Sequence, residues 1–423
     1  MRTKWVSDNN NKNPKTKQEM TAIVGVLNKH AVAIAADSAV TLGGGKKILN
    51  SANKLFALSK YHPVAIAVYG NAEFIGTPWE VIIKEYRKEL KDKSFKTLRQ
   101  YVDDFQKFLK RKKYFCTEKE ADQHLKASVE NFFEEMRFIH TKYPEKVKSV
   151  IYNLEQYGND SLLGGFTNQT VADFKSKVGN LIKKKSDELV KIGFIADSDK
   201  MVEFVENIYT RSVKSGHQTG LVFAGYGENE VFPSIYNCSV GLVIGGLLAK
   251  KVTKSAQINK GCQSAICPFA QTDVMRTMLD GISPKVHEIY IKSLEQTFDK
   301  IKEALATAIQ TTDKGLADKV RGLHADPFAQ EFAKLSAFGQ KREYTAQFVL
   351  SVSSLEKDDL ADFAESLIKL TSLKRKVSFE QETVGGPIDV AVISKGDGLI
   401  WMKRKQYFDA KMNQHYFENY FNH

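Results

Sequence analysis

The chain has 423 residues, of which 42% are hydrophobic and 26% charged, so it is long and apolar enough to bury a large core. No apolar run approaches the ~20 residues of a membrane-spanning helix. The four cysteines form no C-x-x-C pair, which argues against zinc and favours a reduced, cytoplasmic protein without metal or cofactor. The formal net charge of +12 fits attraction to acidic partners but does not bear on the fold.

Residues 1–20 are polar and rich in Asn and Lys, a composition that cannot form a core, so we expect a disordered leader or propeptide. They lack the apolar stretch of a secretory signal. Three interpretations remain open: a propeptide removed by autolysis, an extension upstream of a start at Met20, or a permanent tail on an inactive protein.

Short apolar runs at 22–26 and 31–36, separated by a polar turn, predict a β-hairpin that ends at Asp37. A further strand is predicted to begin at Lys54. Another, over 64–69, stops at Gly70, where a backbone without a side chain allows a ligand to approach closely.

Residues 78–217 read as a helical insertion, followed by a strand at 221–227 and a strand pair over 240–249. A long helix is predicted to begin near Pro284, and another is predicted over 344–372.

Two basic runs, 110–113 and 183–185, lie on or beside the helices of the first insertion. No stacking aromatic residues alternate with these lysines, so a solvated helix face is favoured over a nucleic-acid surface.

Three separated segments, 21–70, 221–227 and 385–398, resemble in chain order the strands of the proteasome β subunit and of its bacterial two-ring peptidase relative. The resemblance implies an α+β fold, the four-layer αββα sandwich of the N-terminal nucleophile hydrolases. The core would comprise 21–77 and 218–423, with one helical insertion at 78–217 and another around 272–343.

The resemblance also implies roles for five residues. Thr21 matches the nucleophile, whose own α-amine takes the hydroxyl proton once Thr21 is the first residue. Lys54 matches the lysine that keeps the nucleophile's surroundings positive, and Asp37 matches the carboxylate that pairs with it. Gly70 matches the oxyanion-stabilising N–H, and Thr41 matches a position that binds the substrate backbone as an added strand.

The late motif departs from the family pattern. An aspartate and a serine usually precede the Gly-Gly pair, where this chain has Gln381 and Val384. Glu380 or Glu382 could replace the aspartate after a small register shift.

The leading hypothesis is a threonine-type hydrolase of peptide or amide bonds. The alternatives are an inactive proteasome-like scaffold or binding protein, and a small-molecule amidase. The resemblance implies a peptide or protein substrate and allows a homo-oligomeric ring and an ATP-dependent unfoldase, with no membrane and no nucleic-acid partner.

Overall fold

The computed structural model describes residues 21–42, 47–49, 51–111, 115–213, 218–378, 384–406, 408–415 and 418. The predicted leader, Glu380, Gln381 and Glu382 lie outside these residues. The chain forms two compact units: unit 1 contains residues 1–270 and 355–423, and unit 2 contains residues 271–354.

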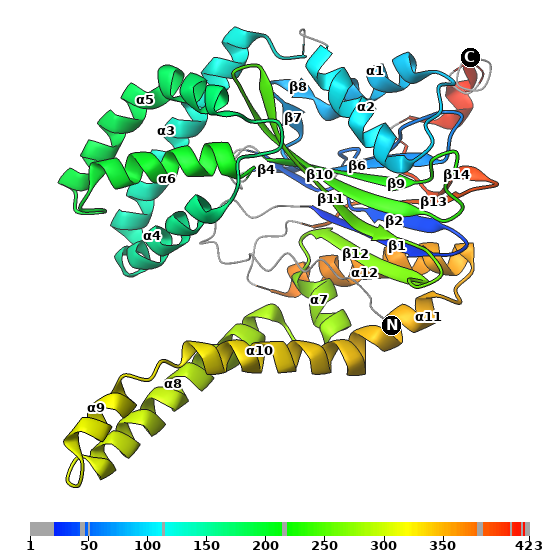
Figure 1. Cartoon of the computed structure of the whole chain (residues 1–423). Coiled ribbons are helices and arrows are strands. Elements are labelled where there is room, and N and C mark those ends of the chain that lie inside the picture. Colours follow the sequence, from blue (N-terminus) through cyan, green and yellow to red (C-terminus); the bar gives the residue numbers. More distant parts are fainter. Residues whose placement is uncertain are drawn as a thin grey trace. The chain divides into compact units, whose positions relative to one another are not determined.

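Unit 1 holds two five-stranded antiparallel sheets (Figure 1). The first sheet has the order β12 (Ser264–Ala270), β1 (Ala22–Asn28), β2 (Val32–Ala36), β13 (Asp389–Ser394) and β14 (Gly398–Lys403). The second has the order β11 (Leu247–Gln257), β10 (Ser234–Ile244), β9 (Thr219–Gly225), β6 (Val64–Gly70) and β5 (Leu55–Ala57). Two small hairpins pair β3 (Val40–Leu42) with β4 (Lys47–Leu49) and β7 (Glu73–Phe74) with β8 (Thr77–Pro78).

The hairpin predicted at the start of the chain is present, because β1 and β2 pair antiparallel with Ile23 opposite Ala36. Both strands are buried along their whole length, as expected for strands covered on both faces. The predicted pair over 240–249 is also present. It is the end of the β10–β11 hairpin, which turns at Gly245 and Gly246 with φ of +56° and +73°.

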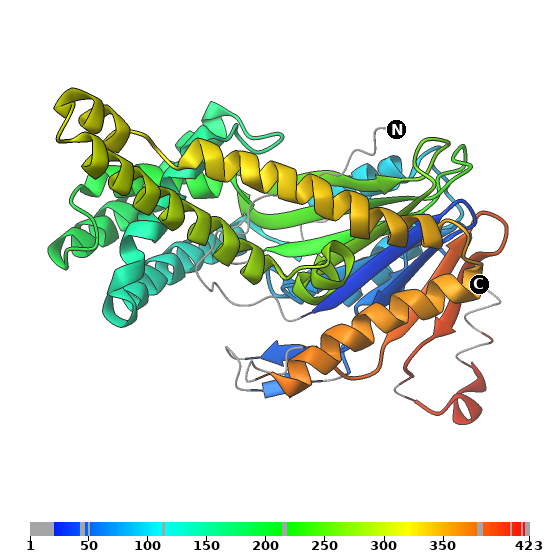
Figure 2. The ribbon, with the colours of Figure 1, turned by 90° about the horizontal axis from the view of Figure 1, so that it is seen from below.

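The described residues of unit 1 form seven α-helices: α1 (Trp79–Leu90), α2 (Leu98–Arg111), α3 (Glu118–Lys142), α4 (Val147–Gln156), α5 (Asn168–Lys191), α6 (Ser198–Arg211) and α12 (Lys357–Val377). A core cluster joins side chains of α1 and α2 to the second sheet, and another lies between the two sheets. A third holds α3 to α6 together. Helix α12 contacts β1, β2 and β13, and Figure 2 shows it running along the first sheet.

Unit 2 is helical: α7 (Asp273–Asp280), α8 (Pro284–Ile309), α9 (Lys314–Arg321), α10 (Asp326–Gln340), a π-helical turn (Lys341–Thr345) and α11 (Ala346–Val352). Helix α8 begins at Pro284, as predicted. Ser283 caps this start, because its side chain accepts a hydrogen bond from the Val286 N–H.

The single helix predicted over 344–372 is wrong, since α11 ends at Val352 and α12 begins at Lys357. The hydroxyls of Ser353 and Ser354 donate to the carbonyls of Leu350 and Ser351. Such local bonds compete with helix continuation. The boundary between the two units falls at this break.

Taken together, the described residues form a mixed helix-and-sheet protein with antiparallel sheets. Among them, no helix is long and apolar enough to cross a membrane.

Candidate active site

The Asp37 carboxylate, directly after β2, accepts hydrogen bonds from four groups. Its Oδ1 receives the Ala22 N–H at 2.9 Å and Lys54 Nζ at 2.8 Å. Its Oδ2 receives the N–H groups of Ala39 and Gly385, each at 3.2 Å. One buried carboxylate therefore connects, by hydrogen bonds, the start of β1, the end of β2, the segment before β5 and the Gly385–Gly386 pair.

Asp37 and Lys54 form a buried ion pair, with the Lys54 amine also donating to the Ala39 carbonyl. Burial lowers the pKa of Lys54 from its ordinary value; the attraction and hydrogen bond of Asp37 oppose that shift, and the positive Lys405 adds to it. The Lys54 amine and the Ala22 N–H bond the same carboxylate oxygen, so the pair is joined to the first residue of β1 through Asp37.

Thr21 is buried and immediately precedes β1, so the Ala22 N–H bond to Asp37 fixes the backbone next to it. On the other side of β1, Ala22 lies opposite Ala270. Ala270 has a φ of +63°, in the left-handed region that favours glycine. A strained residue of this kind costs about 1–3 kcal/mol and is common at functional sites.

Gly70 ends β6 with a φ of +83°, and a Cβ built there would come within 2.6 Å of the Gln218 carbonyl oxygen. The position therefore requires glycine for backbone reasons, apart from any contact with a substrate. Thr41 lies on β3 opposite Ile48.

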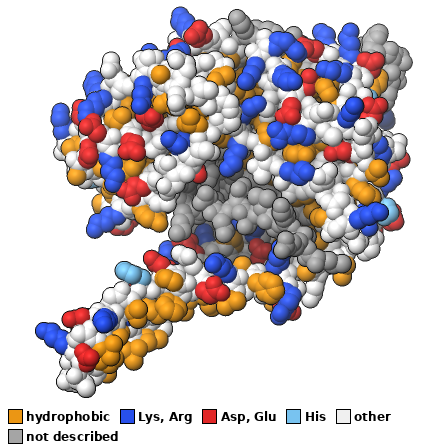
Figure 3. Space-filling model, in the orientation of Figure 1, with side chains coloured by type: hydrophobic (Ala, Val, Ile, Leu, Met, Phe, Trp, Pro, Cys, Tyr) orange, Lys and Arg blue, Asp and Glu red, His pale blue; other side chains and the backbone are white. Residues whose placement is uncertain are grey.

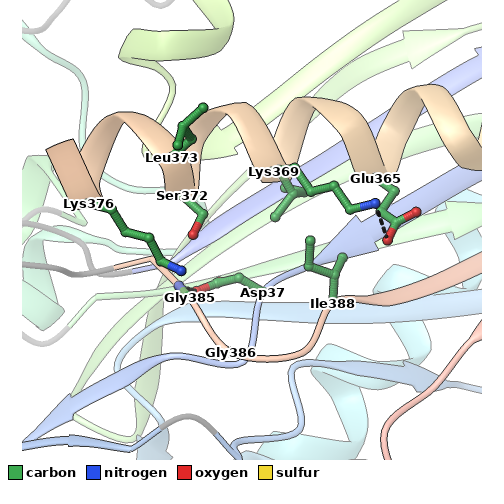
Figure 4. A pocket seen from close by; sticks show the side chains of 10 residues that line it. Asp37, Glu365, Lys369, Ser372, Leu373, Lys376, Gly385, Gly386 and Ile388 are labelled. Atoms are coloured by element: carbon green, nitrogen blue, oxygen red, sulfur yellow. Dashed lines mark hydrogen bonds and ion pairs between the residues drawn. The ribbon is translucent and has the colours of Figure 1, made fainter.

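Around Asp37, a cavity of about 370 Å³ is bounded by α12 and by the turn over 385–388. Figure 4 shows Lys376 and Ser372 projecting from α12 toward Gly385, with Asp37 beside that glycine. The Glu365 and Lys369 side chains form an ion pair at the other end, with a distance of 3.0 Å. Val384, where the family pattern has a serine, is fully buried.

Sequence reasoning missed a second ion pair, in which the carboxylate is buried and the lysine partly buried. Asp389, the first residue of β13, receives both the backbone N–H and the amine of Lys405, at 2.9 and 2.5 Å. The signal was an acidic residue heading the apolar run 390–393, a position where an unpaired carboxylate would be costly. Sequence reasoning also missed a hydrogen bond in which the Ser38 hydroxyl donates to the Pro387 carbonyl at 2.6 Å.

No group of His, Cys, Asp and Glu side chains among the described residues is arranged to hold a metal ion. The described cysteines are all free thiols, and burial raises the pKa of Cys267 to about 12, so this thiol is protonated at neutral pH.

Comparisons with known proteins found no matching family model and no similar curated protein. Among solved structures, the chain is similar to one described as an "Anbu (Gly-1) mutant" from Hyphomicrobium sp. strain MC1. The two share 9% sequence identity with a TM-score of 0.32, over 95% of this chain and 92% of that chain. A likeness of that degree transfers no residue roles, so the site rests on its own geometry.

Proposed function

We propose that the chain is a threonine-type N-terminal nucleophile hydrolase that cleaves peptide or other amide bonds, built on a proteasome-like αββα core with large helical insertions. The placement of α12 on the first sheet, and of α1 and α2 on the second, supports this layer order. The core cluster between the sheets supports it as well.

The observation that carries the proposal is the hydrogen-bonded connection from Lys54 through Asp37 to the Ala22 N–H. It links a buried cation, a carboxylate and the residue after Thr21, at the beginning of a strand whose backbone is paired on both sides. This is the preorganisation that a nucleophile at the start of β1 needs.

In the proposed reaction, the Thr21 Oγ attacks the substrate carbonyl carbon while the Thr21 α-amine takes the hydroxyl proton. Collapse of the tetrahedral intermediate breaks the C–N bond, the amine product leaves with that proton, and an ester to Thr21 remains. Water, deprotonated by the same amine, then hydrolyses the ester and restores the hydroxyl. Lys54 stabilises the developing negative charge, and the Gly70 N–H is the proposed oxyanion donor.

The test is the intact mass of the purified chain expressed from Met1 and from Met20, each with Thr21→Ala as the matched inactive form. The proposal expects a species that begins at Thr21 in the wild type. A peptide epoxyketone, which requires both the hydroxyl and the free α-amine of an N-terminal threonine, should then add once per chain.

Retention of all residues before Thr21 in both forms, with no epoxyketone adduct, would reject the hydrolase. The same outcome would favour the inactive scaffold, and one observation already supports that interpretation. Val384 is buried and apolar where the family pattern places a serine, so a polar group that would orient the amine is missing at that position. Turnover of small amides but not of peptides would favour the amidase.

A further inference from the structure

Unit 2 exposes an unusual share of apolar surface. Of the 26 large hydrophobic side chains that the described residues expose, 13 lie in unit 2, which spans only residues 271–354. Helix α8 has 26 residues but buries only Ala306, and the 15-residue α10 buries only Ala329. Figure 3 shows hydrophobic side chains gathered along these helices.

The exposed residues fall on regular stripes. On α8, Tyr290, Ile301 and Leu305 are more than half exposed and continue the partly buried Leu294 and Phe298 at spacings of three and four residues.

On α10, Phe328, Phe332 and Leu335 follow the same spacing. The rings of Phe298 and Phe328 stack with centroids 4.7 Å apart, which joins the two stripes into one surface. We call the six exposed residues the arm stripe: Tyr290, Ile301, Leu305, Phe328, Phe332 and Leu335. Spacing of this kind is that of helices that pack against further helices.

The charges around the arm stripe narrow the choice of partner. Residues 271–354 carry 11 Lys and Arg and 11 Asp and Glu, so unit 2 is neutral and the whole excess of +12 lies in unit 1. A helix that lies on an anionic membrane has a basic polar face. Unit 2 lacks such an excess, and its charges neutralise one another through pairs such as Lys292–Glu288. Two identical copies would therefore meet without net repulsion.

The exposed area of the arm stripe is also large enough for an interface with a second copy of the chain. An aromatic side chain has roughly 150–250 Å² of surface and an isoleucine or leucine somewhat less, so three of each, about half exposed, leave on the order of 600 Å² open. Two copies that cover each other's stripe would bury about twice that area. This total lies at the ~1,200 Å² where stable protein interfaces begin.

We propose that the arm stripe is a self-association surface, through which two copies of this chain pack α8 and α10 as a four-helix bundle. This inference does not depend on the proposed hydrolase activity. It goes beyond the ring that the family resemblance allows, because it assigns the contact to unit 2.

The test is sedimentation velocity of the full chain from sub-micromolar to tens of micromolar concentration. The wild type should reach at least twice the 47.6 kDa mass of the chain. Ile301→Glu combined with Leu335→Glu should raise the dissociation constant roughly 100-fold or more, because charge replaces the centre of an apolar contact. Gln296→Glu, on the opposite face of α8, is the matched control and should associate like the wild type.

A wild type that stays monomeric throughout would overturn the proposal, as would a double variant that associates as the wild type does. If the double variant loses helical circular dichroism, hydrogen exchange of the wild type decides instead. Protection of α8 and α10 should then rise with protein concentration, and concentration-independent exchange there would reject self-association. Binding of the wild-type monomer, but not of the variant, to phosphatidylserine vesicles would assign the stripe to a lipid surface.

Discussion

Two long helices, α12 in unit 1 and α8 in unit 2, show how similar sequence patterns can have different outcomes. Helix α12 buries Leu360, Leu367 and Ile368 against the first sheet. Helix α8 is longer and has an equally regular apolar stripe, yet it buries one alanine. Periodicity therefore predicts that a helix forms and which face is apolar, whereas the covering partner depends on what the rest of the fold supplies.

The ion pairs of the two units differ in burial, as the two helices do. Unit 1 contains the buried Asp37–Lys54 pair and the largely buried Asp389–Lys405 pair, whereas the Lys292–Glu288 and Arg342–Glu343 pairs of unit 2 are exposed. Buried pairs are costly to break, and exposed pairs contribute little. The comparison can be tested by mutations whose expected effects decrease in size.

The largest effect is expected for Asp37→Asn, which leaves Lys54 buried without its anion. We expect a loss of about 3–5 kcal/mol in the free energy of unfolding and, in an active enzyme, a fall of about 100-fold or more in kcat. Urea denaturation followed by circular dichroism measures the free energy of unfolding. Asp103→Asn is the control, since it removes the same charge from the exposed Arg99–Asp103 pair of α2 and should cost less than about 1 kcal/mol. Equal losses for the two variants would contradict the buried role of Asp37.

A matched pair of leucines compares the two helices directly. Leu367→Ala on α12 removes a side chain that is 1% exposed and should cost about 2–5 kcal/mol, because a cavity forms against the sheet. Leu305→Ala on α8, where the leucine is 52% exposed, should cost less than about 0.5 kcal/mol in dilute solution.

Thermal denaturation at several protein concentrations measures both leucine variants. If a second copy covers the arm stripe, the effect of Leu305→Ala should grow with concentration and that of Leu367→Ala should not. A large effect of Leu305→Ala that is independent of concentration would place its partner within the same chain.

A smaller, pH-dependent effect is expected for Glu365 on α12. Burial raises the pKa of this carboxyl, but hydrogen bonds from Lys403 at 2.5 Å and Lys369 at 3.0 Å outweigh it and lower the pKa below the ordinary value. The folded state therefore favours the charged form. Its contribution is present at neutral pH and is lost as the pH falls through the lowered pKa.

Glu365→Gln should destabilise the protein by about 1 kcal/mol at pH 7. The difference from the wild type should shrink steadily below about pH 4.5, the ordinary pKa of a glutamate. Urea denaturation at a series of pH values measures this difference in the free energy of unfolding. A difference that stays constant down to acid denaturation would contradict the charge-based explanation.

The smallest effect is expected at the start of α8. Ser283→Ala removes the side chain that accepts the Val286 N–H and should cost about 1 kcal/mol, confined to unit 2. Hydrogen exchange should speed up in the first turn of α8 and stay unchanged in α12. Ser283→Asn, which preserves the cap, should behave like the wild type. Faster exchange in unit 1 would show that the units unfold together.

The sequence by itself predicted strands over 22–26, 31–36 and 64–69 and the start of α8, because each depends on local patterns. The structure has these strands at 22–28, 32–36 and 64–70. Unbroken apolar runs indicate strands buried on both faces, and Ser-Pro indicates a helix start. The sequence also predicted one helix across 344–372, but α11 ends at Val352, where the two following serine hydroxyls bond carbonyls of its last turn.

Only the tertiary structure decided which distant groups meet. The Gly385 N–H reaches Asp37 across 348 residues of chain, and the Ser38 hydroxyl reaches the Pro387 carbonyl across 349. The resemblance suggested Asp37 and Lys54 as partners and a helical insertion around 272–343, but no local pattern indicates that one carboxylate joins four segments. Such contacts arise from the packing of sheets and helices, which brings together residues that the sequence keeps far apart.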